Sequence, residues 1–363
     1  MNVHSKEFTV SPYFTFFLIH SLQIGVGMLG FQRLIIKDAG YDAWISIIVM
    51  GVITHFVLFC MHKMLEKDDD LINIHTTCFG KWLGKVFTIF FMLYYGLSCL
   101  NIFRTYIEVV QVWIFPTIKL WQVGLIILFV VYYILSGGFR SITGMCFWGV
   151  ILPLFILAFF VFPLQYAHFR NILPVFTHSF TDIMRSAKQA SLEFLGFEAL
   201  LMFYPFIKKG KSVKRWAHFS IFFTTLLYVL VALLSFVYFS EGLLQHTIWG
   251  TLTMFKIVQI PFIQRFEYVV IFLWFLIVLP NLCLTIWASC QAAHRSFQLP
   301  FKVAFPILIG IIYISSLFFM NRESINTLNT YTSKIGLYLI YVYIPVLFVW
   351  HYFCYRLKNN TSS

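Results

Sequence analysis

The sequence predicts an all-α polytopic membrane protein of about ten transmembrane helices, arranged as two five-helix halves. Three observations support this fold class. Of the 363 residues, 60% are hydrophobic and only 11% are charged, whereas about a quarter of the residues of a soluble domain are charged. Apolar stretches long enough to cross a bilayer recur along the whole chain. The first and the sixth of them are interrupted by glycine, as in transporters with broken midplane helices.

Each predicted span is a predominantly apolar stretch of about 20 residues, the length that crosses a hydrocarbon core. The spans are 12–36 (broken), 41–62, 84–112, 121–138, 143–165, 186–207 (broken), 217–240, 265–292, 301–320 and 334–355.

Loop charge predicts how these spans are oriented. The linker 208–215 carries five basic residues and no acidic one, and Lys and Arg are more frequent on the face that holds both termini. The positive-inside rule therefore predicts cytoplasmic termini. This topology accounts for the net charge of +12, so we expect the lipid bilayer and not nucleic acid as the partner of the basic residues.

The first span contains a glycine-rich stretch at 24–33, with Gly25, Gly27 and Gly30. Glycine permits irregular backbone, which survives at membrane depth only where it lines a cavity or a ligand. A half-helix that restarts near Phe31 would aim the backbone N–H groups of residues 27–30 at a carboxylate. Close helix packing is the alternative, chiefly for Gly25. The G-x-G-x-x-G spacing lacks the strand that a dinucleotide site requires.

The sixth span has a glycine, Gly196, between two acidic residues, Glu193 and Glu198. Interrupted segments at matching positions of two halves indicate a binding site at the midplane. Glu198 would pair with a substrate ammonium or act as a proton-coupled carboxyl; the alternative is a capping or gating residue. Glu193 lies nearer the external end. The predicted division is a cytoplasmic tail (1–11), a first repeat (12–165), an external loop (166–185), a second, inverted repeat (186–355) and a cytoplasmic tail (356–363).

Three further polar residues lie within predicted spans. Arg104 and Glu108 are four residues apart, so they share a helix face and are expected to form an intrahelical pair. Alternatively, Arg104 belongs to an external gate with Glu193 or Glu108 as its partner. Thr285 is a candidate ligand contact, although a threonine in a membrane helix more often bonds to its own backbone.

Other chemistries lack a sequence signal. The seven cysteines show no C-x-x-C spacing, and His20 and His55 are isolated in apolar segments. No nucleophile has an identifiable base. We therefore expect no metal, no cofactor and no catalytic residue.

Two motifs and their spacing resemble a known family. They are Ile-Gly-Val-Gly-Met-Leu-Gly-Phe-Gln-Arg at 24–33 and Glu-Phe-Leu-Gly-Phe-Glu at 193–198, the latter followed by the basic linker. With the ten-span layout, they resemble the B subunits of endospore germinant receptors, permease-like proteins of the amino-acid/polyamine/organocation superfamily. The family usually has Leu-Pro-Arg where this chain has Phe31-Gln32-Arg33.

The resemblance implies a LeuT-type 5+5 inverted repeat in the inner spore membrane. It also implies a small germinant, commonly an amino acid such as alanine, bound between spans one, three, six and eight. The implied partners are a germinant receptor A subunit and a lipoprotein C subunit. The ligand-binding residues carried over are Gly25, Gly27, Met28, Gly30, Gly196, Phe197, Glu198 and, more weakly, Thr285.

The expected function is a ligand sensor, in which an amino acid's carboxylate meets the first break and its ammonium group meets the sixth. Binding shifts the two halves and signals to partner subunits. The alternative within transport is a secondary amino-acid carrier coupled to protons through Glu198. Alternatives from other classes are a membrane-embedded enzyme, such as a lipid-modifying transferase, and a scaffold with a vestigial pocket.

Overall fold

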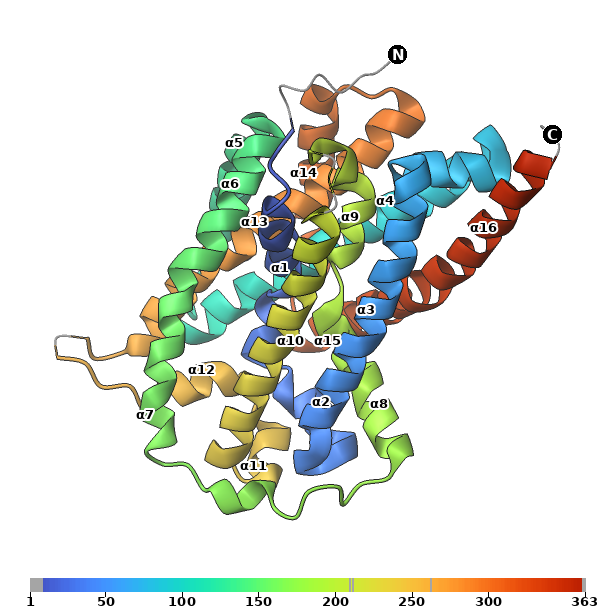
Figure 1. The fold of residues 1–363 in the computed structure, drawn as a ribbon. Helices are drawn as coiled ribbons and strands as arrows, with labels where there is room; N and C mark the ends of the chain where they lie inside the picture. The colour runs from blue at the N-terminus through green and yellow to red at the C-terminus, as the bar shows by residue number, and fades with distance from the viewer. Residues whose placement is uncertain (1–8, 209, 211, 262, 361–363) are drawn as a thin grey trace.

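The computed structural model describes residues 9–208, 210, 212–261 and 263–360. Within these residues all regular secondary structure is helical, and the chain also contains two isolated β-bridges. Six helices are long and apolar enough to span a membrane, and four shorter apolar helices accompany them. Figure 1 shows them as an elongated bundle whose first and last described segments lie at the same end. The predicted all-α fold class is confirmed.

The first span is broken, as predicted. Helix α1 (Phe14–Gln23) ends before a short 3₁₀ segment, η2 (Val26–Leu29), and α2 (Gln32–Ala39) then resumes. The glycines at the break allow close approach of other groups. A methyl group on Gly27 would clash with the Glu193 carboxylate.

The next four spans are continuous helices. They are α3 (Ala43–Asp68), α4 (Leu71–Trp113), α5 (Leu120–Ser136) and α6 (Gly138–Ile151), which runs on through η4 (Leu152–Phe160) and α7 (Val161–Leu164). Helix α4 starts earlier than the predicted span because a short helix precedes it, separated by Gly80 with φ of 75°.

The sixth span is broken at Gly196, which has φ of 108°. A side chain there would be strained, and its Cβ would lie 2.7 Å from Leu22 Cβ. The preceding half starts at Phe180, inside the predicted external loop, because a Ser179–Asp182 capping box begins a helix that is amphipathic rather than apolar. The elements of the span are α8 (Phe180–Ala190), η6 (Ser191–Phe194), η7 (Phe197–Ala199), α9 (Leu200–Phe203) and η8 (Tyr204–Phe206), and a short η5 (Phe169–Ile172) lies in the loop before it.

The remaining spans are α10 (Ser212–Tyr238), α13 (Phe266–Phe297), α14 (Phe301–Ser316) and a last span of three consecutive parts. These parts are α15 (Arg322–Gly336), a π-helical segment η9 (Leu337–Tyr343) and α16 (Ile344–Asn360). The last span therefore starts well before the predicted residue 334. Two short helices, α11 (Glu241–His246) and α12 (Gly250–Phe255), precede α13.

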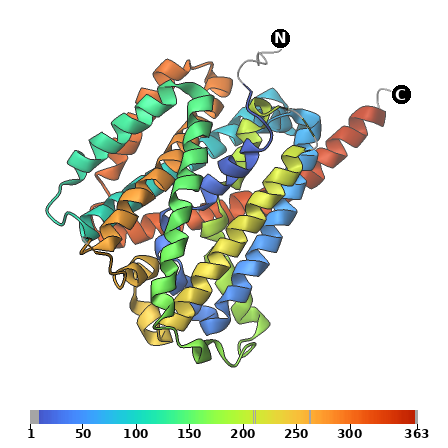
Figure 2. The ribbon, with the colours of Figure 1, turned by 60° about the vertical axis from the view of Figure 1, so that its left-hand side comes forward.

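The broken segments lie at the centre of the bundle. Helix α1 packs against α10 and α6, and α13 packs against α4 and α6. Figures 1 and 2 show α8, α11 and α2 gathered at the end opposite the first and last described segments. At the sixth-helix break, Leu195 packs directly against Gly336, where α15 meets η9.

Candidate functional site

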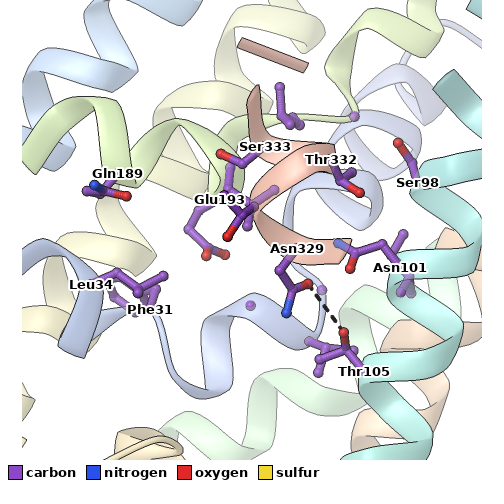
Figure 3. A pocket seen from close by; sticks show the side chains of 18 of the residues that line it. Phe31, Leu34, Ser98, Asn101, Thr105, Gln189, Glu193, Asn329, Thr332 and Ser333 are labelled. Carbon is purple, nitrogen blue, oxygen red and sulfur yellow. Dashed lines mark hydrogen bonds between the residues drawn. The ribbon is translucent and has the colours of Figure 1, made fainter. Parts of the chain in front are cut away.

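A cavity of about 750 Å³ connects the two helix breaks with the end of the bundle that holds α2 and α8. We call it the main cavity. Its inner wall includes Gly25, Gly27 and Gly196, and its outer wall includes residues of α2, α8 and α15. Both breaks predicted from the sequence therefore face one cavity. Figure 3 shows polar side chains of α15 and α4 along its wall.

Side chains of α13 hold the backbone of the first break. Asn281 Nδ2 donates to the carbonyl of Ile24 at 3.0 Å, and Trp274 Nε1 donates to the carbonyl of Gly25 at 3.1 Å. Asn281 is fully buried. An unpaired backbone carbonyl at membrane depth costs free energy, so these two donors stabilise the irregular segment.

A second network holds the start of α2. Thr251 Oγ1 donates to the carbonyl of Met28 at 2.8 Å. Gln32 Nε2 donates to Thr251 Oγ1 at 2.7 Å and to Ser235 Oγ at 3.1 Å. Gln32 is fully buried, at the position where the resembling family usually has proline. Its amide thus joins α2 to α10 and α12, which proline cannot do.

Glu193 occupies the space over the first break. Its carboxylate touches Gly27, and Glu193 Oε2 lies 3.2 Å from the hydroxyl of Tyr228, which also lies 2.9 Å from the carbonyl of Gln23. Figure 3 shows Glu193 reaching the middle of the main cavity, between Phe31 and Asn329. Glu193 lines the cavity and is 6% exposed; its position nearer the external end of the span stays a prediction.

Glu198 is held by its surroundings on both sides. Oε1 accepts from the Tyr94 hydroxyl at 2.9 Å, and Oε2 accepts from the Gly196 N–H at 2.7 Å. The hydroxyl of Tyr95 donates to the Glu198 carbonyl at 3.3 Å. Only 1% of Glu198 is exposed, although it contributes to the cavity wall. This geometry matches the capping alternative, in which the carboxylate closes the sixth-helix break.

The other predicted ligand-binding residues divide into two groups. Gly30 and Thr285 line the main cavity. The Gly30 N–H was expected to point at a ligand carboxylate. In the structure it donates instead to the Gly27 carbonyl at 2.9 Å. The Thr285 hydroxyl donates to the Asn281 and Leu282 carbonyls of its own helix.

Met28 and Phe197 lie outside the main cavity wall. Met28 lines a separate, mostly apolar cavity of about 60 Å³, and Phe197 is fully buried, with its ring centroid 6.2 Å from that of Tyr341.

The predicted pair between Arg104 and Glu108 is wrong. Glu108 Oε2 instead forms an ion pair with Arg322 Nη1 at 2.5 Å. Arg104 Nε donates to the carbonyl of Phe319 at 2.5 Å, and its Nη2 donates to that of Met320 at 3.2 Å. The gate pairing of Arg104 with Glu193 is also not formed. Helical spacing correctly places Arg104 and Glu108 on one helix face. However, both side chains bind groups at the α14–α15 connection instead of each other.

Sequence reasoning missed the polar face that α15 presents to the main cavity. Asn329 Oδ1 lies 3.4 Å from Thr105 Oγ1 of α4, and Figure 3 shows Thr332 and Ser333 on the same wall. The predicted spans 301–320 and 334–355 leave this segment outside any membrane helix, because it is too polar for a lipid-facing span. Hydrophobic windows cannot separate a loop from a helix whose polar face is turned toward an internal cavity.

The chain is similar to known proteins over nearly its whole length. Residues 9–325 match the sequence profile of a family described as spore germination protein. The chain is 42% identical to spore germination protein GerQB of Bacillus cereus over 94% of its own length and 96% of that protein. It is 23% identical to spore germination protein YndE of Bacillus subtilis (strain 168), over 91% and 92% of the two chains.

A solved structure shares the fold. The substrate-bound outward-open state of a Na⁺-coupled sialic acid symporter aligns with a TM-score of 0.57 at 9% identity, covering 94% of this chain and 76% of that one. At this identity the likeness establishes the transporter fold only. Together with the broken helices, it confirms the predicted LeuT-type architecture. The chain is an integral membrane protein and belongs to the family of spore germination proteins.

Proposed function

We propose that this protein is the permease-like, ligand-sensing subunit of a germinant receptor, and that a small germinant, an amino acid, binds in the main cavity. The observation that carries the proposal is a single cavity bounded by both helix breaks, in a member of a spore germination family. Broken-helix midplane cavities are where transporters of this architecture bind small polar molecules.

In this proposal, ligand binding shifts the balance between two arrangements of the halves 12–165 and 186–355. A ligand does this only by binding one arrangement more tightly than the other. The change passes to an A subunit and a lipoprotein C subunit in the inner spore membrane, with both termini of this chain in the cytoplasm.

The test is thermal stabilisation of the purified protein by a panel of amino acids, nucleosides and sugars. A ligand at 100 times its dissociation constant adds about 2.7 kcal/mol to the stability of the folded state. Gly27→Ala places a methyl group against Glu193 and is expected to abolish this stabilisation. Gly144→Ala is the matched control, because nothing lies within 4 Å of a Cβ added there.

A molecule that stabilises the wild type and the control, but not Gly27→Ala, supports the proposal. Equal stabilisation of all three proteins contradicts a site at the break. Stoichiometric, proton-dependent accumulation of the same molecule by proteoliposomes that contain this chain alone would identify a carrier instead of a sensor.

A further inference from the structure

Two buried amide side chains, Gln23 and Asn281, lie at the inner end of the main cavity. Gln23 Nε2 donates to the carbonyl of Phe194 at 3.1 Å, which fixes the orientation of the amide and leaves Oε1 without a partner among the described residues. Asn281 Nδ2 is shared by the carbonyls of Ile24 and Ile277, and its Oδ1 is likewise unpartnered there. Both residues line the cavity and are almost fully buried. The two oxygens are themselves covered by neighbouring protein atoms, so they contribute partial negative charge to this end of the cavity and are not contact points on its surface.

Glu193 adds a carboxylate to these acceptors. Its Oε2 faces Tyr228, and no hydrogen bond to Oε1 is found in the described part of the chain. The carboxylate lies against Gly27, at the position where a ligand carboxylate would have to meet the amides of the first break. Two carboxylates there would repel each other, whereas a protonated amine would form a charge-assisted hydrogen bond with Glu193.

The outer end of the cavity is basic. Six cationic side chains line it, with Asp38 as their acidic neighbour in the lining: Arg33, Lys37, Arg185, Lys188, Arg322 and Lys334. Arg322 pairs with Glu108, and Arg185 lies 3.7 Å from Asp182. For the other four, the described residues provide no ion-pair partner within 4 Å. A cleft mouth dominated by one sign of charge concentrates ligands of the opposite sign.

We propose that the main cavity is polarised for a small zwitterion, whose ammonium group enters first and binds Glu193, near the partial negative charges of the Gln23 and Asn281 amide oxygens, while its acid group faces the basic outer end. This inference rests on the proposed function and specifies the ligand's orientation. It replaces the expectation that the carboxylate meets the first break, because the protein's own Glu193 carboxylate already lies there.

The experiment compares each amino acid that stabilises the wild type with its N-acetyl derivative and its C-terminal amide, in lipid-free detergent micelles. Apparent affinities come from the concentration dependence of the melting midpoint. N-acetylation removes the ammonium charge and is expected to abolish binding. Glu193→Gln is expected to lower the affinity for the amino acid and for its C-terminal amide equally, by about tenfold or more. Both molecules carry the ammonium group, and a hydrogen bond to a charged group contributes about 1.5–3 kcal/mol. Glu66→Gln, at an exposed acid far from the cavity, is the control.

The outer end is tested with the double variant Lys188→Gln/Lys334→Gln, with Lys188→Arg/Lys334→Arg as the charge-preserving control. The glutamine variant is expected to bind the amino acid several-fold more weakly and to bind its C-terminal amide with unchanged affinity. This selective loss is the signature of orientation, because only the acid group then senses the outer charges. These exposed lysines also keep the inference falsifiable if Glu193→Gln does not fold.

Several results would overturn the inference. The first is tight binding of the N-acetyl derivative. The second is an unchanged affinity of Glu193→Gln for the amino acid. The third is an equal loss of affinity for the amino acid and for its C-terminal amide in Lys188→Gln/Lys334→Gln. An effect of the lysine substitutions seen only with anionic lipid vesicles would assign the outer cations to lipid headgroups. Stabilisation by uncharged nucleosides or sugars alone would refute the zwitterion and leave the proposed function standing. If no member of the panel stabilises the wild type, the proposed function fails as well.

Discussion

The Glu198 carboxylate accepts a hydrogen bond of 2.7 Å from the backbone N–H of Gly196, two residues earlier in the chain. This short loop closes the sixth-helix break with a carboxyl side chain in place of the missing helical turn. Tyr94 binds the other carboxylate oxygen, so the break is fixed to α4 as well.

Replacing Glu198 by alanine is therefore expected to lower the stability of the folded state by about 1–3 kcal/mol, because it leaves a buried N–H and a buried hydroxyl unsatisfied. The measurement is the melting midpoint of the purified protein. Tyr94→Phe, which removes one of the two side-chain bonds, should cost less. A normal melting midpoint combined with lost ligand binding would instead make Glu198 a ligand group.

Gly196→Ala tests whether this break requires glycine. Adopting the left-handed conformation costs a residue with a side chain roughly 1–2 kcal/mol, and the contact with Leu22 adds an overpacking cost of roughly 1–3 kcal/mol. Gly138 also has positive φ, but an added Cβ would meet nothing within 4 Å. Gly138→Ala should therefore show the conformational cost alone, and equal destabilisation by the two substitutions would refute the packing argument.

Asn281 and Thr285 provide a contrasting pair one helical turn apart. Asn281→Leu leaves the Ile24 carbonyl without its donor and is expected to destabilise the protein by about 1–3 kcal/mol. Thr285→Val removes a hydroxyl that donates to carbonyls of its own helix, so its effect should stay within about 0.5 kcal/mol. Thermal unfolding measures both. A large loss of ligand affinity in Thr285→Val would show that this hydroxyl turns toward the ligand.

The outer ion pair can be measured by double-mutant cycles. Glu108→Gln and Arg322→Gln are expected to show a coupling energy of about 1 kcal/mol, since the pair is close but partly exposed. The cycle of Glu108→Gln with Arg104→Gln should give a smaller value, because Arg104 binds the carbonyls of Phe319 and Met320. A larger coupling energy for Glu108 with Arg104 than with Arg322 would instead support the intrahelical pair predicted from the spacing.

Local sequence predicted those parts of the fold that depend on local physics. Length and hydropathy located the apolar spans, and the glycines at 25, 27 and 196 located the breaks. The partners of charged residues were not predictable, because Arg322 reaches Glu108 from 214 positions away in sequence. Likewise, sequence could not distinguish the acid that faces the cavity, Glu193, from the acid engaged on both oxygens, Glu198. That difference depends on where Tyr94 and Tyr228 lie.

The last span gives the molecule a mechanical connection from end to end. Helix α15 lines the cavity, and η9 and α16 continue it without interruption toward the end where the first described residues lie (Figure 1). Because Gly336 bears directly on Leu195 of the sixth-helix break, that contact can serve as a fulcrum. A small tilt of α15 about it would be magnified at the tip of α16, since a helix extends 1.5 Å per residue. In such a movement this last span would act as a lever arm, with its short end, α15, at the cavity and its long end, α16, at the opposite end of the bundle.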